Sequence, residues 1–162
     1  MPADERVTRS SFSDRVQPIS VPRPMPLLPR RVWSDEDWER IRLGYRSRDM
    51  DEKWDVFAEG DVVFLHRSWT GNGVFEATFA PGDGGGRRIA EAVVERDAER
   101  YRGDDDEYDC LMLELVLSAI VLGEPARELR EKLVESTRKR SGSTDVPAGL
   151  VQHSALGLRT DP

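Results

Sequence analysis

Hydrophobic and polar positions alternate from Trp54 to Ala80, and this alternation predicts three short antiparallel strands, at 54–58, 62–69 and 74–80. Asn72-Gly73 lies between the last two strands and is a strong hairpin signal, because both residue types tolerate a positive φ. Both faces of the 62–69 strand begin apolar and become polar and aromatic toward its end. This strand is therefore expected to be central in a sheet, with its far end opening onto a surface or cleft.

Apolar residues at helical spacing predict three helices around these strands. The first is expected from 35 to 46, with Ser34 as its N-cap. The second, 107–122, is apolar nearly all round and should lie across the sheet as the core helix. The third is expected from Pro125 to about residue 137. Residues 89–95 fit a fourth strand, although their alanines fit a helix equally well.

The predicted fold class is α+β: a three- to four-stranded antiparallel β-meander packed against a buried apolar helix, with flanking N- and C-terminal helices. Residues 32–137 should form a single domain. Residues 1–31 contain the proline-rich run VPRPMPLLPR and are predicted to be a disordered Pro/Arg-rich tail. Residues 138–162 are rich in Ser, Gly, Thr and Pro and are predicted to be a disordered C-terminal tail.

The net charge of −7 is unevenly distributed along the chain. Residues 32–137 hold 14 basic and 26 acidic side chains, whereas the terminal segments are net positive, +3 for 1–31 and +2 for 138–162. Because an acidic body repels phosphate backbones, no nucleic-acid binding is expected. An acidic domain surface is instead suited to a basic protein partner.

The apolar segments of the chain favour a cytoplasmic protein that does not enter a membrane. The longest nearly apolar stretch, Cys110 to Leu122, has 13 residues and is interrupted by Glu114, so it is too short to span a bilayer. The N-terminus has no apolar run of signal-peptide length. Cys110 is the only cysteine, which fits a reducing compartment.

No catalytic motif of recognised spacing occurs in the chain, and no catalytic residue, metal or cofactor is expected. The glycine-rich segment 81–86 lacks the Gly-Lys-Ser/Thr of a phosphate-binding loop. The acidic run 104–109 has two interpretations, a metal site or the N-cap and first turn of a helix. The helical interpretation is favoured, because carboxylates in a solid run on a helix splay around its axis.

The strongest candidate for a ligand site is the end of the central strand, with its residues His66, Arg67, Ser68, Trp69 and Thr70. His66 is the plausible general base, because His153 falls in the predicted tail. Ser68 lies two residues from His66, too far for direct activation on a regular strand, so a His66 bonded to a backbone carbonyl or a carboxylate is favoured. Arg67 could present its planar fork to an anionic ligand, or could pair with an acid such as Glu76 or one of the 104–109 run.

This segment also carries a resemblance, through Lys53-Trp54-x-Val56-Phe57, Val63-x-Leu65-His66-Arg67-Ser68-Trp69-Thr70-Gly71 and Val74-Phe75. In these residues the chain resembles a family of small uncharacterised bacterial proteins with a "W…FHRSWTG" core. The similarity extends through Glu95-Arg96-Asp97 and Asp106-Glu107-Tyr108-Asp109, and so covers roughly residues 50–123. The family has no established activity, so the resemblance implies domain limits and a key segment rather than a function.

Two functions are compatible with these features. The first is a non-enzymatic binding or interaction module, which the missing catalytic motifs favour. The alternative is a small-molecule site at the His66–Thr70 strand end for an anionic ligand of nucleotide or ADP-ribose type, which the neighbouring Arg67 and Trp69 favour.

Overall fold

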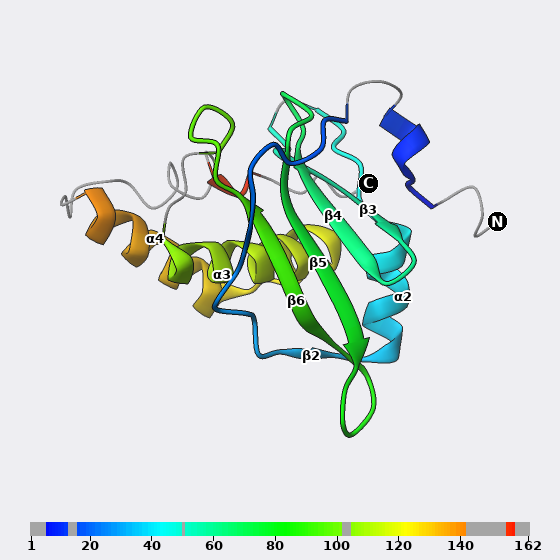
Figure 1. Cartoon of the computed structure of the whole chain (residues 1–162). Helices are drawn as coiled ribbons and strands as arrows, with labels where there is room; N and C mark the ends of the chain where they lie inside the picture. Colours follow the sequence, from blue (N-terminus) through cyan, green and yellow to red (C-terminus); the bar gives the residue numbers. More distant parts are fainter. Residues whose placement is uncertain (1–5, 13–15, 50, 102–104, 142–154, 158–162) are drawn as a thin grey trace.

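The structure is a computed structural model of the 162-residue chain, and it describes residues 6–12, 16–49, 51–101, 105–141 and 155–157. It contains an antiparallel sheet covered on one side by helices, with an N-terminal segment lying across the other side (Figure 1). The α+β class is therefore confirmed.

The sheet has six strands, rather than the three or four predicted. Four consecutive strands form the predicted meander: β3 (Trp54–Glu59), β4 (Val62–Arg67), β5 (Gly73–Pro81) and β6 (Arg87–Glu95). Two short strands, β1 (Pro22–Pro24) and β2 (Val32–Trp33), both pair with β6. The strand order is β1-β6-β5-β4-β3, which makes β4 an inner strand as expected.

Residues 1–31 were predicted to be a disordered tail, and their described parts, 6–12 and 16–31, lie against the sheet. Residues 16–31 run along the sheet, and β1 pairs with the edge of β6. Prolines are tolerated there because an edge strand leaves one row of N–H groups outside the ladder. The Glu95 carboxylate anchors the segment by accepting the backbone N–H groups of Ser20 (2.6 Å) and Val21 (2.8 Å). Met25 is buried beside it.

The N-terminal helix α2 (Asp35–Leu43) is close to its predicted bounds. The Ser34 side chain accepts the N–H of Asp37 at 3.0 Å, which confirms Ser34 as the N-cap. Gly44 then ends the helix with a φ of 77°, a conformation that favours glycine.

The predicted core helix is divided into two parts. Helix α3 (Asp106–Leu115) has Asp105 as its N-cap, and the Asp105 carboxylate accepts the N–H groups of Glu107 and Tyr108. The acidic run therefore acts as a helix start. It continues as the π-helical segment η2 (Val116–Val121), in which every residue is buried. The final helix α4 (Arg127–Ser141) starts two residues later and ends four later than predicted. No described helix is long and apolar enough to cross a membrane.

The core lies between the helices and the inner face of the sheet. Trp54, Val56 and Ala58 of β3 stand beside Arg67, Leu65 and Val63 of β4 on this face. The fully buried large side chains include Trp33, Trp54, Phe75, Phe79, Ile41, Leu65, Met112, Leu113, Leu115, Leu117 and Ile120.

The outer face of the sheet is partly covered by the N-terminal segment. The short 3₁₀ helix η1 (Arg9–Phe12) places Phe12 against Phe57, with ring centroids 5.8 Å apart. Arg9 lies over the rings of Phe57 (5.0 Å) and Phe64 (4.9 Å) and pairs with Glu59. These contacts bury His66 and Asp55 on the same face, and so shape the end of β4.

Candidate functional site

Strand β4 departs from regular pairing with β5 between Leu65 and His66, close to the predicted site. Such irregularities re-aim side chains at a strand end. Arg67 lies on the inner face opposite Trp54, whereas His66 lies on the outer face opposite Asp55. The five predicted site residues are therefore not brought together around one cavity. They divide between the two faces and the turn that follows.

The guanidinium of Arg67 lies 5.0 Å from the centroid of the Trp54 ring and donates a hydrogen bond to the Ala155 carbonyl at 2.8 Å. Burial lowers the pKa of Arg67, and the nearby phenols of Tyr108 and Tyr101 oppose that shift. The predicted pairing with Glu76 does not occur, because Glu76 stands opposite Phe64 on the other face of the sheet. Arg67 thus holds a backbone carbonyl of its own chain.

That carbonyl belongs to a short C-terminal segment, Ala155–Gly157, docked onto the strand end. The Ala155 oxygen also accepts the indole N–H of Trp54 at 3.0 Å, so two side chains bind one carbonyl. Leu156 is fully buried in the core cluster. Gly157 pairs with Glu52 in an isolated bridge and has a φ of 76°. A Cβ on Gly157 would lie 2.6 Å from Lys53 Cγ, so this position requires glycine.

His66 and Ser68 are both buried and both bonded to backbone carbonyls. His66 Nδ1 lies 2.8 Å from the Gly71 oxygen, which confirms the favoured prediction for this histidine. Because a carbonyl oxygen can only accept, Nδ1 carries the hydrogen of this bond. Burial lowers the pKa of His66 from its ordinary 6.5. The Ser68 hydroxyl donates to the Glu52 carbonyl at 2.8 Å. Both groups therefore stabilise the strand end.

A small cavity lies next to these two side chains. Its volume is about 10 Å³, about that of one water-sized probe, which is far too small for a metabolite. Its lining is mostly apolar and consists of Phe12, Val16, Asp55, Phe57, His66, Ser68 and Gly71.

Trp69 and Thr70 occupy the turn beyond β4. Trp69 is 60% exposed, and the Lys53 ammonium lies 4.2 Å from its ring centroid. The Thr70 hydroxyl accepts the N–H of Asn72 at 3.1 Å and so shapes the turn. Trp69 is thus the member of the predicted set that presents a large apolar surface to solvent.

Several functional contacts at this strand end could not be identified from the sequence. Trp54 was predicted as the start of a strand, but not as a donor to a distant carbonyl. Ala155–Gly157 lay in the segment predicted to be disordered, and three residues are too few to show periodicity. His153 and Asp104 lie outside the described residues. Among the described residues, no group of three or more His, Cys, Asp or Glu side chains is arranged to hold a metal ion.

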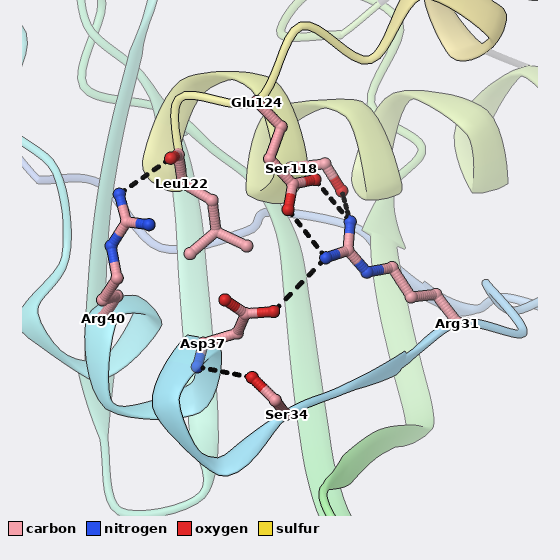
Figure 2. Close-up of polar contacts among 7 residues, drawn as sticks. All are labelled: Arg31, Ser34, Asp37, Arg40, Ser118, Leu122 and Glu124. Carbon is pink, nitrogen blue, oxygen red and sulfur yellow. Dashed lines mark hydrogen bonds and ion pairs between the residues drawn. The ribbon is translucent and has the colours of Figure 1, made fainter.

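A second polar cluster, shown in Figure 2, joins the N-terminal segment to the π-helical segment η2. Arg31 donates to both carboxylate oxygens of Glu124, at 2.6 and 2.9 Å, and to the hydroxyl of the fully buried Ser118 at 2.9 Å. Asp37 of α2 approaches the same guanidinium at 3.4 Å. The hydrogen bond from Arg31 holds the pKa of Glu124 below its usual value. With these contacts made, the cluster acts as a structural clamp.

Comparison of the chain with protein-family models, with curated proteins and with solved structures finds no match. The resemblance to the "W…FHRSWTG" family therefore stays a prediction, and function has to be inferred from the geometry of the chain itself.

Proposed function

We propose that this chain is a non-enzymatic interaction module that binds a linear peptide segment at the end of β3 and β4. The observation that carries this proposal is the docked Ala155–Gly157 segment. Its first carbonyl is held by Arg67 and Trp54, its leucine is fully buried, and its glycine fits where a Cβ would collide. Backbone capture combined with one buried side chain is a common way to recognise an extended peptide.

In this proposal the resident segment is an internal ligand that a partner segment of similar chemistry can replace. The partner segment would carry a leucine preceded by an accessible carbonyl and followed by glycine. The acidic body of the domain, with 26 acidic and 14 basic side chains in residues 32–137, would favour a basic sequence around that motif. The partner is thus a basic protein with an exposed Leu-Gly segment.

The alternative, an anionic small molecule at His66–Thr70, is less well supported by this geometry. An anion at this strand end would need the Arg67 fork, and Arg67 donates to Ala155. His66 lies on the opposite face of the sheet from Arg67, so the two side chains do not converge on one anion. A peptide carbonyl matches the donors present here better than a phosphate does.

The test uses the full-length chain with Leu156→Asp, which should release the resident segment because a carboxylate cannot be buried at that position without a large cost. The variant is titrated with a fluorescent peptide that has the sequence of residues 151–160. We expect the variant to bind the peptide at least about tenfold more tightly than the wild type, in which the tethered segment competes at high effective concentration. A peptide with aspartate in place of the leucine should not bind.

Leu27→Asp is the matched control, because Leu27 is 44% exposed and lies away from the strand end. It should bind the peptide as weakly as the wild type. If Leu156→Asp fails to fold, Leu156→Ala serves in its place. A folded variant that does not bind the peptide would refute the proposal.

A further inference from the structure

An open concavity of about 770 Å³ lies on a different part of the molecule, where the end of α2 meets the N-terminal segment and η2. Its described lining contains three arginines and no acidic side chain: Val7, Arg40, Leu43, Gly44, Tyr45, Arg46, Ser47, Arg48 and Val121. In a domain with almost twice as many acidic as basic side chains, this is an unusual local composition.

The backbone that carries the arginines is fixed from several sides. Tyr45 and Val56 exchange two backbone hydrogen bonds, both of 2.8 Å, so the segment after α2 is tied to the edge strand β3. The N–H of Val7 donates to Leu43 at 2.7 Å. Gly44 has a φ of 77°, and a Cβ there would lie 2.4 Å from the Val56 oxygen. The arginines therefore project from a framework that needs little ordering when a ligand binds.

Two buried carboxylates hold this framework. Asp55 accepts the backbone N–H of Ser47 at 2.7 Å, and Glu52 accepts that of Arg48 at 2.8 Å. Both acids are buried, and neither lines the concavity. These two carboxylates thus stabilise the loop and do not contribute to the lining of the concavity.

We propose that this concavity binds a phosphate-bearing small molecule of about nucleotide size. The guanidinium fork of arginine matches two phosphate oxygens, and three such groups around one hollow suit a multiply charged anion. Arg40 uses one donor on the Leu122 carbonyl (2.7 Å, Figure 2), which anchors it and leaves its other N–H groups for a ligand. The volume lies in the range of small-molecule sites and is much larger than a single phosphate requires.

The negative charge of the rest of the domain favours a small phosphorylated molecule over a nucleic-acid strand as the ligand. A nucleic-acid strand would have to lie along an acidic body, and repulsion would oppose each phosphate outside the concavity. A compact phosphorylated molecule places its charge inside the arginine cluster alone. This proposal does not depend on the peptide site at the end of β4.

The experiment is calorimetric titration of the full-length chain with inorganic pyrophosphate and, separately, with a nucleoside triphosphate. We expect both to bind the wild type, the nucleotide more tightly because it fills more of the concavity. Arg46→Gln and Arg48→Gln should each raise the dissociation constant about fivefold or more, as expected for loss of one partly exposed charge contact. Both variants should keep the unfolding midpoint of the wild type.

Arg42→Gln is the matched control. Arg42 lies on α2 near Arg40 and pairs with Glu39, but does not line the concavity, so its removal should change the dissociation constant by less than about twofold. Equal weakening by Arg42→Gln would show that only net charge matters and would overturn the proposal. So would the absence of binding at millimolar ligand, or an oligonucleotide binding more tightly than the nucleotide.

Discussion

Substitution of Arg31 by Met is expected to destabilise the protein more than the loss of an ordinary surface ion pair. Arg31 joins the N-terminal segment to η2 through Glu124 and Ser118, and to α2 through Asp37 (Figure 2). Its guanidinium also lies 5.3 Å from the Trp33 ring centroid. Methionine retains most of the side-chain volume and removes every one of the polar contacts.

The expected magnitude follows from the exposure of the groups. The side chains of Arg31 and Glu124 are 27% and 37% exposed, so their pair should contribute more than a fully exposed pair but less than a buried one, about 1 kcal/mol. The hydroxyl of Ser118 is buried, and loss of its donor costs about 1 kcal/mol more. A total of about 2 kcal/mol should lower the unfolding midpoint by roughly 4–8 °C in a chain of this size.

The measurement is urea unfolding of the wild type, Arg31→Met, Glu124→Gln and the double variant. The double-mutant cycle should give a coupling free energy of about 1 kcal/mol. Arg42→Met is the control, because the Arg42–Glu39 pair is exposed and should contribute less than about 0.5 kcal/mol. Equal effects of Arg31→Met and Arg42→Met would refute this reasoning.

The effect of Arg31→Met on stability should also depend on pH. Arg31 lowers the pKa of Glu124 below its usual 4.5, so the pair stabilises the fold above that pH. This stabilisation is lost as the pH falls through the folded-state pKa. The difference in stability between wild type and Arg31→Met should therefore shrink in acid, and a constant difference from pH 7 to pH 3 would contradict it.

Two further predictions concern the strand end. Because burial, aided by Arg9, lowers the pKa of His66, its stabilising contribution is present above pH 6.5 and is lost as the pH falls toward the folded-state pKa. His66→Gln should therefore flatten the loss of stability between pH 7.5 and 5, and an unchanged pH profile would contradict this reasoning. Gly157→Ala should release the docked segment, because of its positive φ and the collision with Lys53, and should shift the NMR signal of the Trp54 indole N–H. Gly84→Ala, where a Cβ would meet nothing within 4 Å, should leave that signal unchanged.

Local pattern was sufficient to predict most of the regular elements. The alternation through 54–80 and the cap at Ser34 were read correctly, because both signals come from residues close in sequence. The π-helical segment η2 could not be predicted, because a run that is apolar at every position has the same sequence pattern in an α-helix and in a π-helix. Strand β1 was missed because it lies in the proline-rich run, and β2 because it has only two residues; both are ordered by pairing with the distant β6.

The contacts at the end of β4 could not be predicted from the sequence. The sequence directed attention to the end of β4, where Arg67 and Trp69 do lie, yet the partner of Arg67 comes from a carbonyl 88 positions away. Any residue can supply a carbonyl, so no side-chain pattern marks the one that a guanidinium will bind. Similarly, the arginines of the concavity are spaced along a helix end and a loop, and only the fold gathers them with Val121 of η2.

One loop segment links the two proposed sites. Glu52 fixes the arginine-bearing loop through its carboxylate, accepts the Ser68 hydroxyl with its carbonyl, and pairs with Gly157 of the docked segment. A buried carboxylate that contributed to stability alone could often be replaced by a hydrophobic residue. Glu52 instead holds the backbone at Arg48, in the loop of the proposed basic concavity, and at Gly157, in the proposed peptide site. Glu52 therefore fixes, with its side chain and its backbone, both the arginine-bearing loop after α2 and the docked segment at the strand end.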